Sequence, residues 1–229
     1  MIGVTLSAAR DTVNLGRICG DAAFRGMPRP YCRGRELPAG GAKAGTLQAA
    51  PACGTSHPMI ERYSEAGGQR SPALFSPCGQ YRYGLERVWS AGPALLYIML
   101  NPSTADETRN DPTIERCQRR AVALGFGAMR IANLFAFRAT RPRDLRRADN
   151  PVGPDNDALV LHWHREAGMT LAGWGTHGAH KGRGAGMAAQ LEGAVHTLGL
   201  TRDGHPRHPL YVSYAQEPCP WPRERRYCA

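Results

Sequence analysis

Lysine is almost missing from this chain, since it occurs only at Lys43 and Lys181, so arginine carries nearly all of the positive charge. The formal net charge of +10 suits a polyanionic partner such as nucleic acid, although a coding bias toward arginine would give the same composition. Long apolar runs are also missing, and no convincing secretory signal is present. These absences argue against a membrane span and favour a soluble, cytoplasmic protein.

Motifs for metals and common cofactors are missing as well. The seven cysteines contain no CxxC pair, which argues against a zinc ribbon and gives no support to an iron–sulfur cluster. No GxxxxGK[ST] phosphate loop is present, and no GxGxxG follows a strand in a dinucleotide-binding context. We therefore expect neither a cofactor nor a bound metal.

The composition of the chain changes after its first quarter. Residues 1–58 are rich in Gly, Pro, Ala and Arg and show no sustained helical or strand period. We expect them to be disordered, or to be an extension that precedes a true start at Met59. Residues 59–80 are predicted to be a lead-in segment, 81–214 an α/β domain, and 215–229 a basic tail.

Apolar and polar runs alternate through this expected domain. The apolar run 95–100 is typical of a strand buried on both faces, and Pro102 ends it because proline cannot donate to a sheet ladder. Asp111 and Pro112 open a helix that Gly125 ends. The other expected elements are an edge strand or lead-in at 81–89, strands at 129–137, 169–174 and 210–214, and helices at 155–167 and 186–198. This order predicts a three-layer α/β sandwich with a mainly parallel central sheet of about four strands.

Polar clusters follow the expected strands at their carboxyl ends, where open α/β sheets place ligand sites. Each cluster has an ordinary explanation by itself, since asparagine and serine often cap turns and a histidine beside proline often belongs to a surface loop. Four such clusters together favour one shared site. They are Asn101-Pro102-Ser103 with Asp106, Asn133 leading to Arg138, Trp174-Gly175-Thr176-His177, and His205-Pro206-Arg207-His208-Pro209.

Six motifs carry a family resemblance. They are Met99-Leu100-Asn101-Pro102-Ser103-Thr104-Ala105-Asp106, Asp111-Pro112-Thr113, Asn133-Leu134-Phe135-Ala136-Phe137-Arg138-Ala139-Thr140, Pro151-Val152-Gly153-Pro154-Asp155-Asn156-Asp157, Trp174-Gly175 and Gly204-His205-Pro206-Arg207-His208-Pro209-Leu210-Tyr211. In these motifs residues 81–214 resemble a bacterial and phage family catalogued as domain of unknown function 1643. That resemblance implies no particular activity.

The order of the motifs is also similar to that of the uracil-DNA glycosylase superfamily, which implies a parallel α/β sandwich with its site at the strand ends. The resemblance implies that Asn101 positions an attacking water and that Asn133 reads a flipped base. Ser103 stands where that superfamily often has glycine. Either His205 or His208 would stabilise the departing base, because the late His-Pro motif holds one residue too many here.

The leading hypothesis is a protein that binds or hydrolyses a nucleic-acid base or nucleotide. A histidine donor can stabilise negative charge on a leaving base, and asparagine can present a donor and an acceptor to a base edge. The expected catalytic residues are Asn101, Asp106, His205 and His208. The expected substrate-binding residues are Pro102, Ser103, Asn133, Phe135, Arg138, Trp174 and Arg207.

Two other functions stay open. A non-catalytic module would bind a nucleotide or DNA through arginines of the segment 138–147, with an affinity that falls steeply with salt and no turnover. A metal-dependent hydrolase would use the pairs His177/His180 and His205/His208. Both pairs lie in Gly/Pro-rich loops, where this spacing does not hold the rings on one face as a helix would.

Overall fold

The computed structural model describes residues 58–221. Most of the segment expected to be disordered or an upstream extension, and the end of the expected basic tail, lie outside this range. The strands are β1 (Ile60–Ala66), β2 (Gln69–Phe75), β3 (Arg82–Val88), β4 (Ala94–Met99), β5 (Ala128–Asn133), β6 (Met169–Ala172), β7 (His196–Thr197) and β8 (Cys219–Pro220). The helices are α1 (Pro112–Ala123), α2 (Pro142–Arg147), α3 (Asn156–Glu166) and α4 (Arg183–Gln190), with short 3-10 segments η1 (Thr176–Gly182) and η2 (Pro209–Tyr211).

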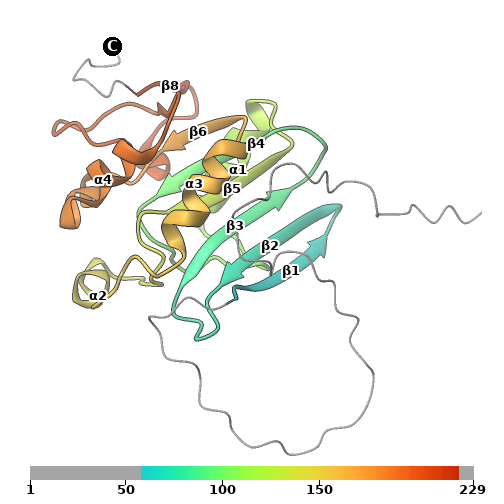
Figure 1. Cartoon of the computed structure of the whole chain (residues 1–229). Coiled ribbons are helices and arrows are strands. Elements are labelled where there is room, and N and C mark those ends of the chain that lie inside the picture. Colours follow the sequence, from blue (N-terminus) through green and yellow to red (C-terminus); the bar gives the residue numbers. More distant parts are fainter. Residues whose placement is uncertain (1–57, 222–229) are drawn as a thin grey trace, which may run out of the picture. The chain divides into compact units, whose positions relative to one another are not determined.

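These strands form one mixed sheet in the order β1-β2-β3-β5-β4-β6-β7-β8 (Figure 1). β4 pairs in parallel with β5 and β6, and β6 pairs in parallel with β7. The other four pairings, β1–β2, β2–β3, β3–β5 and β7–β8, are antiparallel. The prediction of a mainly parallel, four-stranded, uracil-DNA-glycosylase-like sheet is therefore wrong. A parallel centre exists, but antiparallel strands extend it at both edges, and β3 lies inside the sheet rather than at its edge.

The largest departure from the prediction is the hairpin that β1 and β2 form. Ala66 pairs with Gln69, so the turn consists of Gly67 and Gly68 alone, with φ angles of 58° and 77°. Two consecutive residues at positive φ favour glycine, and a Gly-Gly pair between two strands is a hairpin signal. The sequence contains this hairpin signal at Gly67-Gly68.

Helices cover both faces of the central strands. β4 alternates, so that Leu95, Tyr97 and Met99 belong to the buried cluster under α1, whereas Leu96 and Ile98 belong to the cluster under α3 and α4. Figure 1 shows α3 lying across one face of the sheet. Burial on both faces explains why this strand is an unbroken apolar run.

The expected cap of α1 is confirmed. Asp111 Oδ1 accepts hydrogen bonds from the backbone N–H groups of Thr113 and Ile114, each at 2.9 Å. This satisfies two of the N–H groups that every helix start leaves without a partner. The predicted helix at 155–167 is likewise confirmed by α3.

The last third of the chain differs from the prediction. The helix expected at 186–198 ends at Gln190, because Gly193 has a φ of 71° and residues 196–197 enter the sheet as β7. The prediction of a strand at 210–214 is also wrong. Pro209 opens the 3-10 turn η2 there instead, and the side chain of His208 accepts from Leu210 N at its start.

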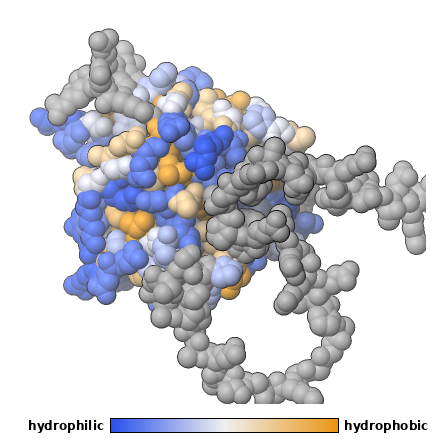
Figure 2. Space-filling view, viewed as in Figure 1, coloured by the Kyte–Doolittle hydropathy of each residue, from blue (hydrophilic) through white to orange (hydrophobic). Residues whose placement is uncertain are grey.

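The exposed surface mixes polar and apolar residues. On the face that Figure 2 shows, hydrophilic residues in blue alternate with smaller apolar areas in orange. Among the residues at 58–221, no helix is long and apolar enough to cross a membrane.

Candidate functional site

A cleft of about 570 Å³ opens at the carboxyl ends of β4, β5 and β6. The start of α1, the loop after β6 and the loop before η2 complete its walls. The cleft collects residues from all four polar clusters that the sequence placed at strand ends. The residues of the sequence-based prediction that line it are Asn101, Ser103, Asn133, Trp174, Arg207 and His208.

The side chain of Asn101 connects two backbone segments at this end of the sheet. Its Nδ2 donates to the backbone carbonyls of Pro102, at 2.9 Å, and Ala139, at 2.7 Å. Both amide protons are therefore committed to the protein, since an asparagine amide has only two. The group that Asn101 can still offer to a ligand is its acceptor, Oδ1.

Asn133, the last residue of β5, differs from Asn101 because its amide donor is not used by the described protein. Its side chain is 1% exposed, and its Nδ2 has no hydrogen-bond partner within the described protein. A buried donor without a partner costs about 1–3 kcal/mol, so natural proteins rarely keep one that has no purpose. Asn133, which lines the cleft, thus holds a buried donor that no described residue satisfies.

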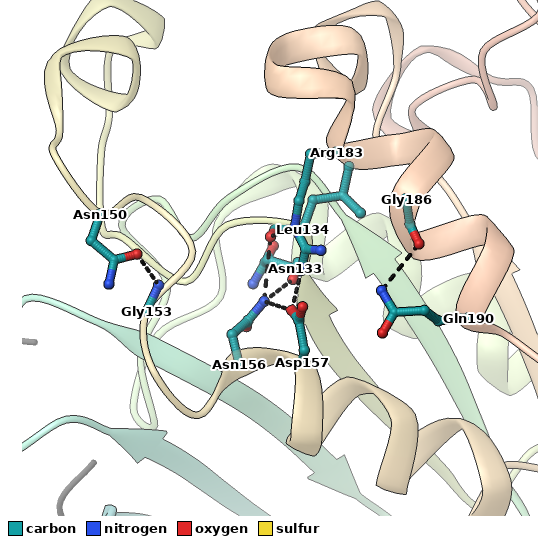
Figure 3. A network of polar contacts seen from close by, with 9 residues as sticks. All are labelled: Asn133, Leu134, Asn150, Gly153, Asn156, Asp157, Arg183, Gly186 and Gln190. Carbon is teal, nitrogen blue, oxygen red and sulfur yellow. Dashed lines mark hydrogen bonds and ion pairs between the residues drawn. The ribbon is translucent and has the colours of Figure 1, made fainter. Parts of the chain in front are cut away.

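A polar network behind Asn133 holds its backbone in place (Figure 3). The buried Asn156, at the start of α3, donates to the carbonyls of Asn133, at 2.9 Å, and Leu134, at 3.3 Å. Arg183 donates to the same Leu134 carbonyl at 2.9 Å and forms an ion pair with Asp157. Figure 3 shows these side chains converging from α3, α4 and the end of β5. Asn156, Asp157 and Arg183 were not predicted to act at the site, although the motif at 151–157 contains the first two.

His208 lies in the cleft as a neutral imidazole. Its Nδ1 accepts from the backbone N–H of Leu210 at 3.3 Å, which leaves the proton on Nε2. Burial lowers the pKa of His208, and the nearby charge of Asp111 partly opposes that shift. The ring of Tyr211, which is 76% exposed, lies 5.6 Å from the His208 ring. The cleft therefore holds a neutral donor beside an exposed aromatic surface.

Neighbouring elements keep His208 in position. Gly175 donates its N–H to the Pro206 carbonyl at 2.8 Å, in a left-handed conformation (φ 69°) that favours glycine. On the other side, Arg116 of α1 donates to the carbonyls of Pro209, at 3.1 Å, and Val212, at 2.6 Å. The loop that carries His208 is thus tied both to the end of β6 and to α1.

Two charged residues in the cleft had no place in the predicted site. Arg82, on β3, is 2% exposed and lines the cleft, and burial lowers its pKa to about 10. Asp111 lines the cleft as well, although one of its oxygens caps α1. No local motif marks Arg82 in the sequence, because only the pairing of β3 with β5 brings it to the site.

Five predicted site residues lie outside the residues that line this cleft. Asp106 stabilises a turn, since its Oδ1 accepts from Thr108 and from Arg109 N; burial raises its pKa, but these hydrogen bonds bring it below the usual value. Phe135 is fully buried in the core, with its ring 5.6 Å from that of His180. The other three are Pro102, which is buried, Arg138, which lines a shallow hollow beside Gly79, and His205, which lines a separate hollow beside α4.

The histidine pairs do not form a metal centre in the described part of the chain. Across residues 58–221, no three His, Cys, Asp or Glu side chains gather where they could hold a metal ion. His205 and His208 also line different hollows.

The fold and the cleft define an α/β protein with a cleft at the carboxyl ends of its parallel central strands. Residues 82–210 match the model of a family described as "Protein of unknown function (DUF1643)", so the chain belongs to this family. This confirms the first of the two resemblances, whereas nothing found supports the second, to the uracil-DNA glycosylase superfamily. A search of the curated proteins finds no match.

Proposed function

We propose that the cleft binds a nucleobase-containing small molecule through an edge on which an N–H group stands beside a carbonyl. The observation that carries the proposal is the Nδ2 of Asn133, a residue that lines the cleft, because this buried donor has no hydrogen-bond partner among residues 58–221. The Oδ1 of Asn101 supplies an acceptor, because both of its amide protons are used by the protein. One donor and one acceptor complement the amide edge of bases such as uracil, guanine or hypoxanthine.

The sheet register supports a joint role for the two asparagines. Asn133 pairs with Met99 in the parallel ladder of β4 and β5, and Asn101 follows Met99 by two residues. β4 and β5 therefore end beside each other, and both asparagine side chains line the same cleft.

The remaining lining suits a planar ring as well. Tyr211 exposes most of its ring at the cleft, where a base can stack on it. The volume of about 570 Å³ lies within the range of roughly 300–1,000 Å³ that is common for small-molecule sites. A nucleoside or nucleotide fits such a volume.

Calorimetric titration with uridine, guanosine, inosine, cytidine and adenosine tests the proposal. Asn133→Ala should weaken binding of the preferred nucleoside about tenfold or more, because the ligand acceptor loses a hydrogen bond in a buried site. Gln190→Ala is the matched control, since Gln190 is an exposed amide on α4 whose Nε2 donates only to Gly186 O. Equal affinity of the Asn133 variant and the native protein for every nucleoside would refute the proposal.

Hydrolysis of an N-glycosidic bond is a second candidate function. It is favoured by Asp111 and neutral His208, which line the same cleft and interact electrostatically. The second oxygen of Asp111 would accept a proton from water, and His208 Nε2–H would donate to the leaving base. Incubation with nucleosides, nucleotides and uracil-containing or mismatched DNA, followed by chromatography of released base, tests this reaction. Binding without any released base would favour the non-catalytic module.

A further inference from the structure

Arg82 is a buried cation in the cleft wall that has no anionic partner among the residues that the structure describes. In the described part of the chain, its side chain forms one hydrogen bond, from Nη1 to the backbone carbonyl of Ala105, and its Nε has no partner. Within residues 58–221, no carboxylate oxygen lies within 4.0 Å of its guanidinium nitrogens. Asp111 is the largest source of favourable charge, yet it acts only from a distance.

Arg87 shows how a second buried arginine on the same strand differs from Arg82 in its partners. Arg87 lies on the same strand, β3, and is also 2% exposed. Its Nε donates to Asn110 Oδ1 at 3.0 Å, Nη1 to Glu86 O at 3.0 Å and Nη2 to Asp106 O at 2.6 Å. Each guanidinium nitrogen of Arg87 therefore has a partner, and Arg87 does not line the cleft. Arg82 does line the cleft, and its Nε has no partner among the described residues.

The charged residues that line the cleft also favour an anionic ligand. Its lining contains two arginines, Arg82 and Arg207, and one carboxylate, Asp111. Since His208 stays neutral, the cleft has an excess of positive charge. A buried charge without a partner is costly, and an anion in the cleft would relieve that cost.

We propose that Arg82 binds the phosphate monoester of the ligand, so that the cleft is selective for free nucleoside monophosphates. This rests on the proposed nucleobase site, to which it adds a phosphate subsite carried by a separate observation. A planar guanidinium donates two parallel hydrogen bonds to a phosphate, which suits a group with an unused Nε. A terminal phosphate can enter as far as a side chain that is only 2% exposed, whereas a phosphodiester inside a DNA strand continues on both sides.

Matched ligand pairs test the inference without any mutation. Calorimetry compares each nucleoside with its 5′-monophosphate, together with inorganic phosphate and a short single-stranded oligonucleotide of the same base. The monophosphate should bind about tenfold or more tightly than the nucleoside. Equal affinity for the two overturns the phosphate subsite but leaves the nucleobase site standing. Absence of binding by both overturns the proposed function, and tighter binding of the oligonucleotide overturns the selectivity for free nucleotides.

Two arginine variants assign the subsite. Arg82→Met should bring the affinity ratio of monophosphate to nucleoside close to one, while the affinity for the nucleoside stays within about twofold. Arg87→Met is the matched control, and it should lower thermal stability but keep the ratio. Arg82→Lys keeps the charge without the planar fork and should give an intermediate ratio, so a folded variant is available if Arg82→Met does not fold. An unchanged ratio in both Arg82 variants would contradict the inference.

Discussion

Two side chains in the cleft, Asn133 and Arg82, hold buried donors that no residue at 58–221 satisfies. Such donors reduce the free energy of unfolding, and proteins keep them mainly where a ligand uses them. At the scale of single residues, the proposed function and the stability of the fold therefore oppose each other in this cleft. Removing a donor that serves only the ligand should cost the fold little.

Alanine substitutions of Asn133 and Asn156 test whether an unsatisfied donor lowers stability. Asn133→Ala should change the free energy of unfolding by less than about 0.5 kcal/mol, or increase it, because an unsatisfied buried donor is removed. Asn156→Ala should lower it by about 1–3 kcal/mol, because the buried carbonyls of Asn133 and Leu134 lose their donor. Urea denaturation of both variants measures the difference. A larger loss in Asn133→Ala would show that its side chain is structural.

His208 should make stability depend on pH. Burial lowers its pKa in the folded protein below the usual 6.5, so the unfolded chain takes up the proton at a higher pH. The contribution of His208 is then fully present above about pH 6.5 and is lost as the pH falls toward the folded pKa. His208→Asn keeps an acceptor for Leu210 N but cannot be protonated. The stability difference between native protein and variant, measured by urea denaturation from pH 5 to 8, should rise with pH and level off; a flat difference would contradict the assignment.

At the scale of elements, α1 connects the core to the site. Ile114, Cys117 and Ala121 pack under the sheet, and Cys117 is a free, fully buried thiol whose pKa burial raises strongly. Its cap, Asp111, lines the cleft, while Arg116 holds the loop of His208. A shift of this one helix would move both walls of the cleft.

Two substitutions of Asp111 distinguish its role as the cap of α1 from its proposed role in base release. Asp111→Ala should lower the free energy of unfolding by about 0.5–2 kcal/mol, since two backbone N–H groups lose their acceptor. Asp111→Asn keeps a capping oxygen and should stay within about 0.5 kcal/mol of the native protein. If Asp111 also acts in base release, only the turnover should fall in Asp111→Asn. Thermal denaturation together with the chromatographic assay distinguishes the two roles, and equal stability of both variants would show that the cap contributes nothing.

Elements with strong local signals were predicted well. The cap at Asp111, the run that forms β4 and the pattern of α3 each depend on residues close in sequence. The pairing of β3 with β5, the short β7 and the turn at Pro209 depend instead on distant contacts. The carbonyls that follow Pro209, for example, are taken by Arg116 and Arg120, more than 90 positions earlier, so a segment with strand-like composition forms no strand.

At the scale of the whole molecule, the net charge of +10 and the cleft should give two kinds of anion binding. Contacts of surface arginines with DNA release counterions, so affinity for duplex DNA should fall by roughly 10³–10⁵ between 50 and 200 mM salt if six to ten phosphates are contacted. Binding of one phosphate in a buried subsite should weaken far less. Fluorescence anisotropy with labelled duplex and calorimetry with the monophosphate, over the same salt series, measure the two slopes. Equal slopes would contradict a buried nucleotide site.

The sequence by itself determined the family, the central apolar strand and the presence of polar residues at strand ends, because each depends on local composition or short motifs. Asn101, Asn133 and His208 were identified in this way. Only the tertiary structure decided that the sheet is mixed, that Asp106 and Phe135 lie outside the cleft, and that Arg82 lies in its wall. The physical reason is that strand pairing and the burial of a charge depend on residues far apart in the chain, whereas caps, turns and apolar runs depend on neighbours.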